Sequence, residues 1–240
     1  FFFFFLKQAV LITTIEQRGP MVVAKSKYKN KTIQEIYEIL YRYAPNTYYW
    51  QTAIFNILRD MEYLRFDLQP SMNRLSIPEY INTFNAPIES RLACYESISL
   101  SRHLLNTMNT YIDNFSEQID KFYYPKFEVL LACLLHDFGK SKKLQARLEI
   151  SNINELKHEE ISGHYIDDLA KRVDGKYIFN KGVRDDEFYL SISQLEKVKK
   201  AVIEHHKQNI IKGSLSELLK LIDHKTRENE YSEYARRINK

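Results

Sequence analysis

Apolar residues recur every three to four positions through much of the chain, and the prolines that would interrupt helices are confined to its first part. The last of the six prolines is Pro125, so no proline breaks a helix beyond it. Ile161, Tyr165 and Leu169 follow one another at four-residue intervals, which places their side chains on one face of a helix. The pattern predicts a mainly all-α protein.

Two helices are predicted in the N-terminal third. Thr32-Ile33-Gln34-Glu35 has the form of a capping box, which typically opens a helix. A second helix is expected from about Thr47 to Leu64. The segment Gln69–Pro87 contains three prolines and is expected to be an irregular linker.

The residues before these helices are apolar or β-branched. Phe1–Leu6 is an apolar run much shorter than the ~20 residues that cross a bilayer. It is either the end of a membrane helix that lies upstream, which would attach the chain to a membrane, or a hydrophobic segment of the core. Val10–Ala24 is rich in Val, Ile and Thr around a Gly-Pro pair, and this pattern predicts a β-hairpin or an extended arm.

Helix follows helix in the rest of the chain. Asp174-Gly175 marks a turn, and the polar residues up to Asp186 are expected to form a loop. The expected helices cover residues 89–115, 125–139 and 154–173, followed by two that begin at capping boxes at Ser193 and Ser214. The chain is thus divided into an apolar or extended arm, a helical region with a linker, and a larger helical domain, at residues 1–30, 31–88 and 89–240.

Composition excludes several classes of protein. The net charge is only +4, so no strong basic field indicates nucleic acid, although anionic substrates are compatible with it. Cys94 and Cys133 are too few for a Cys-rich zinc module or a disulfide framework. Cys133 lies in an apolar run and is expected to be a small buried hydrophobe, and the expected location is the reducing cytoplasm.

The strongest chemical signal is the segment Leu134–Lys140. Its apolar helix delivers an adjacent imidazole and carboxylate, His136 and Asp137, and then stops at Gly139. Burying a charge beside a His is costly unless something compensates for it, and a metal ion does so. Lys140 follows one short turn later, where it could meet a phosphate.

Other His and Asp residues extend this signal. Side chains from facing helices of a bundle converge inward. Imidazoles combined with carboxylates suit Mn, Fe, Co, Ni or Zn, with Mg at a carboxylate-rich position. Each of the five groups lies on a different predicted helix: His103; His136-Asp137; His158; His205-His206; and Asp223.

This order resembles that of the HD superfamily of metal-dependent phosphohydrolases. His136-Asp137-Phe138-Gly139-Lys140 matches the signature His-Asp-x-Gly-Lys, and the segment from His158 to Gly163 resembles the helix start that carries a further ligand. The resemblance covers Glu89–Glu230 and implies an HD-domain helical bundle of the two-metal branch. His206 is not followed by Gly-Tyr-Pro, so the chain does not resemble the HD-GYP type.

Carried over to this sequence, the resemblance implies a centre of two divalent metal ions. The first ion would be held by His103, His136, Asp137 and Asp223. A second ion, bridged to the first by Asp137, would be held by His158, His205 and His206. A metal-activated hydroxide would attack the phosphorus. The catalytic residues would be Asp137 and Lys140, the latter neutralising a phosphate oxygen.

Several positions have an alternative interpretation. The first His of the family often follows a Tyr-Glu start and precedes Ser, but here Ser97 follows Tyr95-Glu96 directly. In that register the first ligand is missing and His103 takes no part. His158 and His164 compete for one role, with His158 preferred and His164 placed behind the site or at the surface.

Three further alternatives concern the other ligands and the lysine. His205 and His206 point about 100° apart if the helix continues through them, so one of the two is the firmer ligand. Asp223 could form a surface ion pair with Arg227, four residues on, although its apolar neighbours favour burial. Lys140 could simply complement a helix C-terminus.

Three functions are therefore considered. The first is hydrolysis of a phosphoester in a phosphorylated small molecule, such as a nucleotide, or in a nucleic acid. The second is a nuclease or relaxase module for single-stranded DNA, in which aromatic residues could stack on bases: Tyr41, Tyr43, Tyr48, Tyr49 and Trp50. The third is a degenerate HD fold that serves as a scaffold or binding module.

Overall fold

The computed structural model describes residues 28–72, 87–117, 122–179 and 185–239. The predicted hairpin at Val10–Ala24 and the apolar start at Phe1–Leu6 lie outside these residues. The described residues form helices and, apart from an isolated β-bridge between Pro70 and Ser99, no β-structure. The predicted all-α class is confirmed. No described helix is both long and apolar enough to cross a membrane.

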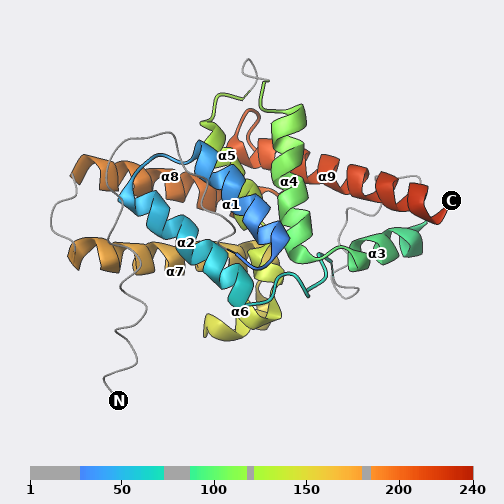
Figure 1. Cartoon of the computed structure of the whole chain (residues 1–240), viewed down its shortest axis with the longest axis horizontal. Helices are drawn as coiled ribbons and strands as arrows, with labels where there is room; N and C mark the ends of the chain where they lie inside the picture. The colour runs from blue at the N-terminus through green and yellow to red at the C-terminus, as the bar shows by residue number, and fades with distance from the viewer. Residues whose placement is uncertain (1–27, 73–86, 118–121, 180–184, 240) are drawn as a thin grey trace.

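The helices form a bundle in which α5 occupies the centre (Figure 1). All seven residues from Val129 to Leu135 have fully buried side chains, so α5 is enclosed on every side. In chain order the elements are α1 (Lys31–Tyr43), α2 (Tyr48–Tyr63), α3 (Ile88–Ser97), α4 (Leu100–Asn114), α5 (Lys126–Leu135), the 3-10 helix η3 (Phe138–Lys140), α6 (Lys142–Arg147), η4 (Ile153–Glu155), α7 (His158–Phe179), α8 (Asp185–Glu204) and α9 (Leu215–Ile238).

Helices α1 and α2 share one hydrophobic core with the helices that follow them. The Trp50 ring on α2 packs edge-on against Phe127 of α5, with 4.8 Å between ring centroids. Thr47 caps α2 as its predicted position requires, accepting a hydrogen bond from the Trp50 N–H. The N-cap of α1 is Asn30 rather than Thr32, because the Asn30 side chain accepts from Ile33 N–H at 3.1 Å.

The single helix predicted over residues 89–115 is wrong, because the chain breaks it into α3 and α4. Ile98 is extended, and Ser99 caps α4 by accepting from the Arg102 N–H. The turn after α2 binds to this break, since the Ser71 N–H donates to the Ile98 carbonyl at 2.8 Å. The break frees α3 to pack against the far half of α9 (Figure 1).

Helices α7 and α8 are also longer than predicted. The chain remains helical through Asp174 and up to Phe179, so the predicted turn at Asp174-Gly175 is wrong. Ser193 lies inside α8, which already begins at Asp185, so its capping box is not a helix start. The two helices pack along each other (Figure 1), and this tertiary packing overrides local turn and capping preferences. Ser214 does cap α9, as predicted.

Candidate metal centre

Five helices bring the predicted ligands to one place inside the bundle. His136 is the C-cap of α5, so the central apolar helix itself carries the His-Asp pair into the interior. The other ligands come from α4, from the first residue of α7, from the end of α8 and from the middle of α9: His103, His158, His205, His206 and Asp223.

Gly139 allows the close approach that builds the site. A Cβ at this position would overlap the backbone carbonyl of His158 and crowd Ile161. The Gly139 N–H donates to Ser162 Oγ at 2.8 Å, and the Ser162 hydroxyl donates to the His136 carbonyl at 3.0 Å. The start of α7, with His158, is thereby fixed against the chain that carries Asp137.

The ligands fall into overlapping groups. Two groups share Asp137, and a third joins His205 to His136 and Asp223. Oδ2 of Asp137 lies 3.4 Å from Nε2 of both His103 and His136. Asp223 Oδ1 lies 3.3 Å from Nε2 of His103 and 3.7 Å from Nε2 of His136. We call these four residues the inner set: His103, His136, Asp137 and Asp223. The buried position of Asp223 agrees with the interpretation that its apolar neighbours favoured.

The other oxygen of Asp137 faces a second group of histidines. Asp137 Oδ1 lies 3.2 Å from His158 Nε2, which is also 3.2 Å from His206 Nε2. His205 stacks obliquely on His206 with 3.7 Å between ring centroids, so the end of α8 brings both rings to the site. We call this group the outer set: Asp137, His158, His205 and His206. One ligand atom from each lies within 4.8 Å of the others.

Each fully buried imidazole uses its Nδ1 to hold the ring in place. Nδ1 of His136 and of His205 donate to the backbone carbonyls of Cys133 and Val202, at 2.8 and 2.6 Å. His103 Nδ1 lies 3.0 Å from Glu230 Oε1. With the proton on Nδ1, the Nε2 lone pair of each ring points into the cluster, as a metal ligand requires.

The site therefore contains buried polar atoms without well-aligned hydrogen bonds. They are Nε2 of His103, His136 and His205, and Oδ1 of Asp137 and Asp223. Burying such atoms unpaired is costly. Atoms about 2.1 Å from one cation lie about 3.0 Å apart at a right angle and about 3.4 Å apart at a tetrahedral angle, so the observed spacings suit a shared cation. These residues can hold a metal ion.

The electrostatics of the site favour ionised Asp137 and Asp223 and neutral rings at His205 and His206. Burial would raise the pKa values of Asp137 and Asp223, but the neighbouring imidazoles, joined by Lys140 at Asp137, outweigh it and hold both pKa values well below the usual range. Burial lowers the pKa of His205 to about 3 and that of His206 to about 4. Both rings are thus neutral at pH 7 and available to a metal.

His103 behaves differently because carboxylates face both of its nitrogens. Burial and Arg227 lower the pKa of His103. The carboxylates of Glu230, Asp137 and Asp223 raise it by more, so that the pKa is about 10. In the absence of a cation the ring therefore carries a proton, and a divalent ion would take the place of that proton. The structure places His103 in the cluster and not outside it.

Lys140 lies at the rim of the site. Its ammonium group donates to Asp137 Oδ2 at 2.6 Å, and 17% of the side chain is exposed. His158 is 20% exposed, whereas the side chains of His103 and His136 are completely buried. The side of the centre where His158 and Lys140 lie is therefore the partly exposed one.

Three buried charged residues support the cluster, although none of them was predicted to lie at the metal centre. Glu159 Oε2 lies 3.2 Å from His158 Nδ1, while Glu230 holds His103. Arg227 lies 3.6 Å from Asp137 Oδ2, so it is a buried neighbour of the site and not a surface ion-pair partner. Arg227 and Glu230 follow Asp223 by four and seven residues, and this helical spacing was the signal that could have found them.

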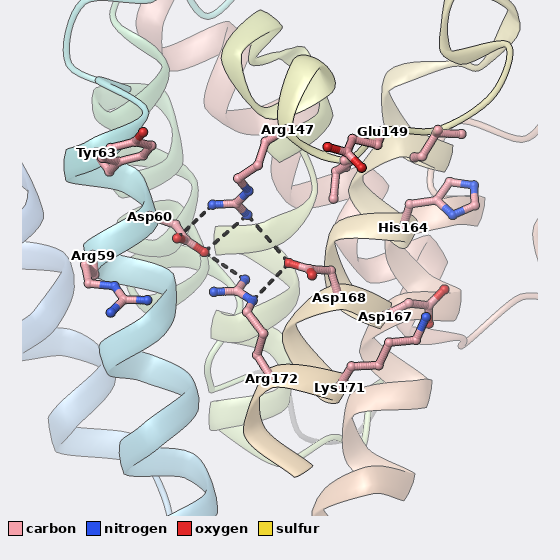
Figure 2. Close-up of a pocket in the computed structure, with 12 residues that line it drawn as sticks. Arg59, Asp60, Tyr63, Arg147, Glu149, His164, Asp167, Asp168, Lys171 and Arg172 are labelled. Carbon is pink, nitrogen blue, oxygen red and sulfur yellow. Dashed lines mark hydrogen bonds and ion pairs between the residues drawn. The ribbon is translucent and has the colours of Figure 1, made fainter. Parts of the chain in front are cut away.

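His164 lies apart from the centre, exposed on a groove of about 780 Å³ between α2, α6 and α7 (Figure 2). The buried Asp60 carboxylate accepts hydrogen bonds from Arg147 and Arg172, each at 2.8 Å, and from the Tyr165 hydroxyl at 3.0 Å. Asp168 lies between the same two guanidinium groups (Figure 2). The groove has as many acidic as basic side chains, so its charges mainly join the three helices.

The aromatic cluster proposed for base stacking is divided by the fold. Tyr49 and Trp50 are buried in the core, and the Trp50 ring N–H donates to Gln194 at 3.2 Å. These two rings are not available to a nucleic acid. Tyr41 and Tyr48 remain exposed.

Comparison of the chain with protein-family models, with curated proteins and with solved structures found no match.

Proposed function

We propose that this chain is a metal-dependent phosphohydrolase of the HD type, which binds two divalent cations and cleaves a phosphoester of a nucleotide or a nucleic acid. The observation that carries the proposal is that the two carboxylate oxygens of Asp137 face different groups of histidines. One oxygen faces the inner histidines and the other faces His158. A carboxylate in that position is suited to bridge two ions, and the order of the ligands along the chain resembles the HD superfamily.

The two sets offer different chemistry to a metal. The inner set has two carboxylates and two imidazoles. The outer set has the shared carboxylate and three imidazoles. Such mixed donors suit Mn, Fe, Co, Ni or Zn more than Ca. When bound, a pair of these ions would supply Lewis-acid chemistry and lower the pKa of water.

The residues of the chain would place the substrate. The substrate would approach from the partly exposed side, where Lys140 and His158 lie. The Lys140 ammonium has three donors and uses one on Asp137, so it can donate to a phosphoryl oxygen. A cation fixed at this position stabilises the negative charge that grows on phosphoryl oxygens in the transition state.

The test is hydrolysis by the purified protein with Mn²⁺. The substrates are p-nitrophenyl phosphate, bis(p-nitrophenyl) phosphate, a nucleotide panel and labelled single-stranded DNA. We expect turnover of at least one class, reduced at least about 100-fold in Asp137→Ala. Asp113→Ala changes an exposed carboxylate on α4 and should retain full activity.

The outcomes separate the three functions. Activity that survives Asp137→Ala would overturn the proposal. The absence of bound metal by elemental analysis would also overturn it and would favour a scaffold. Cleavage of DNA without turnover of nucleotides would favour the nuclease or relaxase module.

A further inference from the structure

A buried arginine, Arg227, lies against the inner set and is not itself a metal ligand. Arg227 is on α9, one turn after Asp223, and only 7% of it is exposed. Its Nη2 lies 3.6 Å from Asp137 Oδ2, and its Nε lies 4.0 Å from Asp223 Oδ1. Both carboxylates of the inner set therefore face the same guanidinium group.

Arg227 is fixed in this position by neighbours on other elements. Its guanidinium donates to Ser71 Oγ at 2.9 Å and to the Ser71 carbonyl at 3.2 Å. It also donates to Glu230 at 3.2 Å and lies 4.8 Å from the centroid of the Tyr95 ring. A guanidinium held on several sides cannot swing away when another cation arrives, and it stays charged at any physiological pH.

The positive charges around Asp137 are distributed unequally. Lys140 and Arg227 both lie against Oδ2, the oxygen that faces His103 and His136. Oδ1, which belongs to the outer side, instead faces the ring of His158. The inner carboxylates are thus already compensated, and in a buried site the repulsion between a fixed guanidinium and a nearby dication is weakly screened.

We propose that Arg227 makes the two metal positions unequal, so that the outer position binds its cation first and the inner position binds its cation more weakly. The inference rests on the proposed dinuclear centre. Arg227 replaces part of the charge that an inner ion would otherwise supply, and the protein is then folded and singly loaded at low metal concentration. Its second ion arrives only when the metal concentration rises.

The experiment is calorimetric titration of the metal-free protein, residues 1–240, with Mn²⁺, with electron paramagnetic resonance to detect spin-coupled pairs. We expect two binding events in the unaltered protein, with dissociation constants at least tenfold apart. His103→Gln should remove the weaker event, and His206→Gln should remove the tighter one. These two variants assign the events to the inner and outer positions.

Substitution of Arg227 then tests the cause. In Arg227→Gln the second dissociation constant should fall at least tenfold, whereas Arg227→Lys, which keeps the charge, should leave it within about threefold. Arg237→Gln removes a charge from an exposed position on the same helix and should change neither event. A purely structural role would instead weaken both events in both Arg227 variants.

The results distinguish this inference from the proposed function. Equal affinities in the unaltered protein, loss of the tighter event in His103→Gln, or unchanged binding in Arg227→Gln would overturn the inference alone. If Arg227→Gln does not fold, the His103 and His206 variants still show which position binds its metal ion first, and this order still tests the inference. Absence of any Mn²⁺ binding would overturn both.

Discussion

Oδ1 of Asp137 lies 3.2 Å from Nε2 of His158, on the side of the carboxylate opposite to the inner histidines. Since His158 is the first residue of α7, the position of one helix terminus decides whether the outer set exists. His164 lies on the same helix, exposed on the groove of Figure 2, and provides a natural control.

We predict that His158→Gln lowers the metal content by one ion per chain and hydrolysis at least about 100-fold. A lost ligand removes the outer position, whereas His164→Gln should change neither property. Elemental analysis and turnover with Mn²⁺ measure both. Equal losses in the two variants would contradict the assignment of His158.

Gly139→Ala should destabilise the protein because a methyl group has no space beside the His158 carbonyl. We expect a loss of about 3 kcal/mol in the free energy of unfolding, at the upper end for overpacking. Gly213→Ala is the comparison: its φ of +75° is strained for Ala, but no atom lies within 4 Å. That variant should lose only about 1 kcal/mol. Urea unfolding of metal-free protein gives both values, and equal losses would exclude steric overlap as the cause.

The sequence was sufficient to predict the helical class and the meeting of the ligand groups. The reason is that a His-Asp pair buried at the end of an apolar helix needs other polar groups or a metal ion as partners. The break at Ser99 was not predicted. Ser99 is a local N-cap for α4, but the extended Ile98 before it is held by a hydrogen bond from Ser71 N–H, which lies 27 residues earlier in the chain. Arg227 and Asp60 likewise gain their roles from partners on other helices.

Asp60→Asn should weaken the joint between α2, α6 and α7 without changing the metal centre. The variant leaves Arg147 and Arg172 facing a neutral amide in a partly buried site. We expect a loss of about 2 kcal/mol in the free energy of unfolding. Breaking a fully buried ion pair costs ~3–5 kcal/mol. The loss should be smaller here because both arginine side chains are more than a quarter exposed. The exposed pair Arg65–Asp67 is the control, and Asp67→Asn should lose less than about 1 kcal/mol. Urea unfolding and Mn²⁺ titration test both parts, and altered metal affinity in Asp60→Asn would be the contrary result.

Glu230→Gln should weaken metal binding at the inner position by about 10- to 100-fold. The carboxylate orients His103 through Nδ1 and increases the basicity of Nε2, and the amide does so less well. It also leaves Arg227 less compensated, which adds to the repulsion of an inner ion. Glu228→Gln, on the same helix but paired at the surface with Lys225, is the control. Mn²⁺ calorimetry should show a weaker affinity in one of the two binding events. If stability falls while both affinities stay the same, Glu230 stabilises the fold but does not affect metal binding.

The stability of the metal-free protein should fall on both sides of about pH 6.5, the ordinary pKa of histidine. Above it, the unfolded chain releases the proton that folded His103 keeps up to a pKa of about 10, so stability is lost as the pH rises through that window. Below about pH 6.5, His205 and His206 both take up a proton in the unfolded chain. In the folded protein they do not, because their pKa values are about 3 for His205 and about 4 for His206. The folded state is therefore less stable as the pH falls. Thermal unfolding in the presence of a chelator across pH 5 to 10 measures both limbs. His103→Gln should remove the alkaline limb and leave the acidic one, and an alkaline limb that persists in this variant would show that another group is responsible.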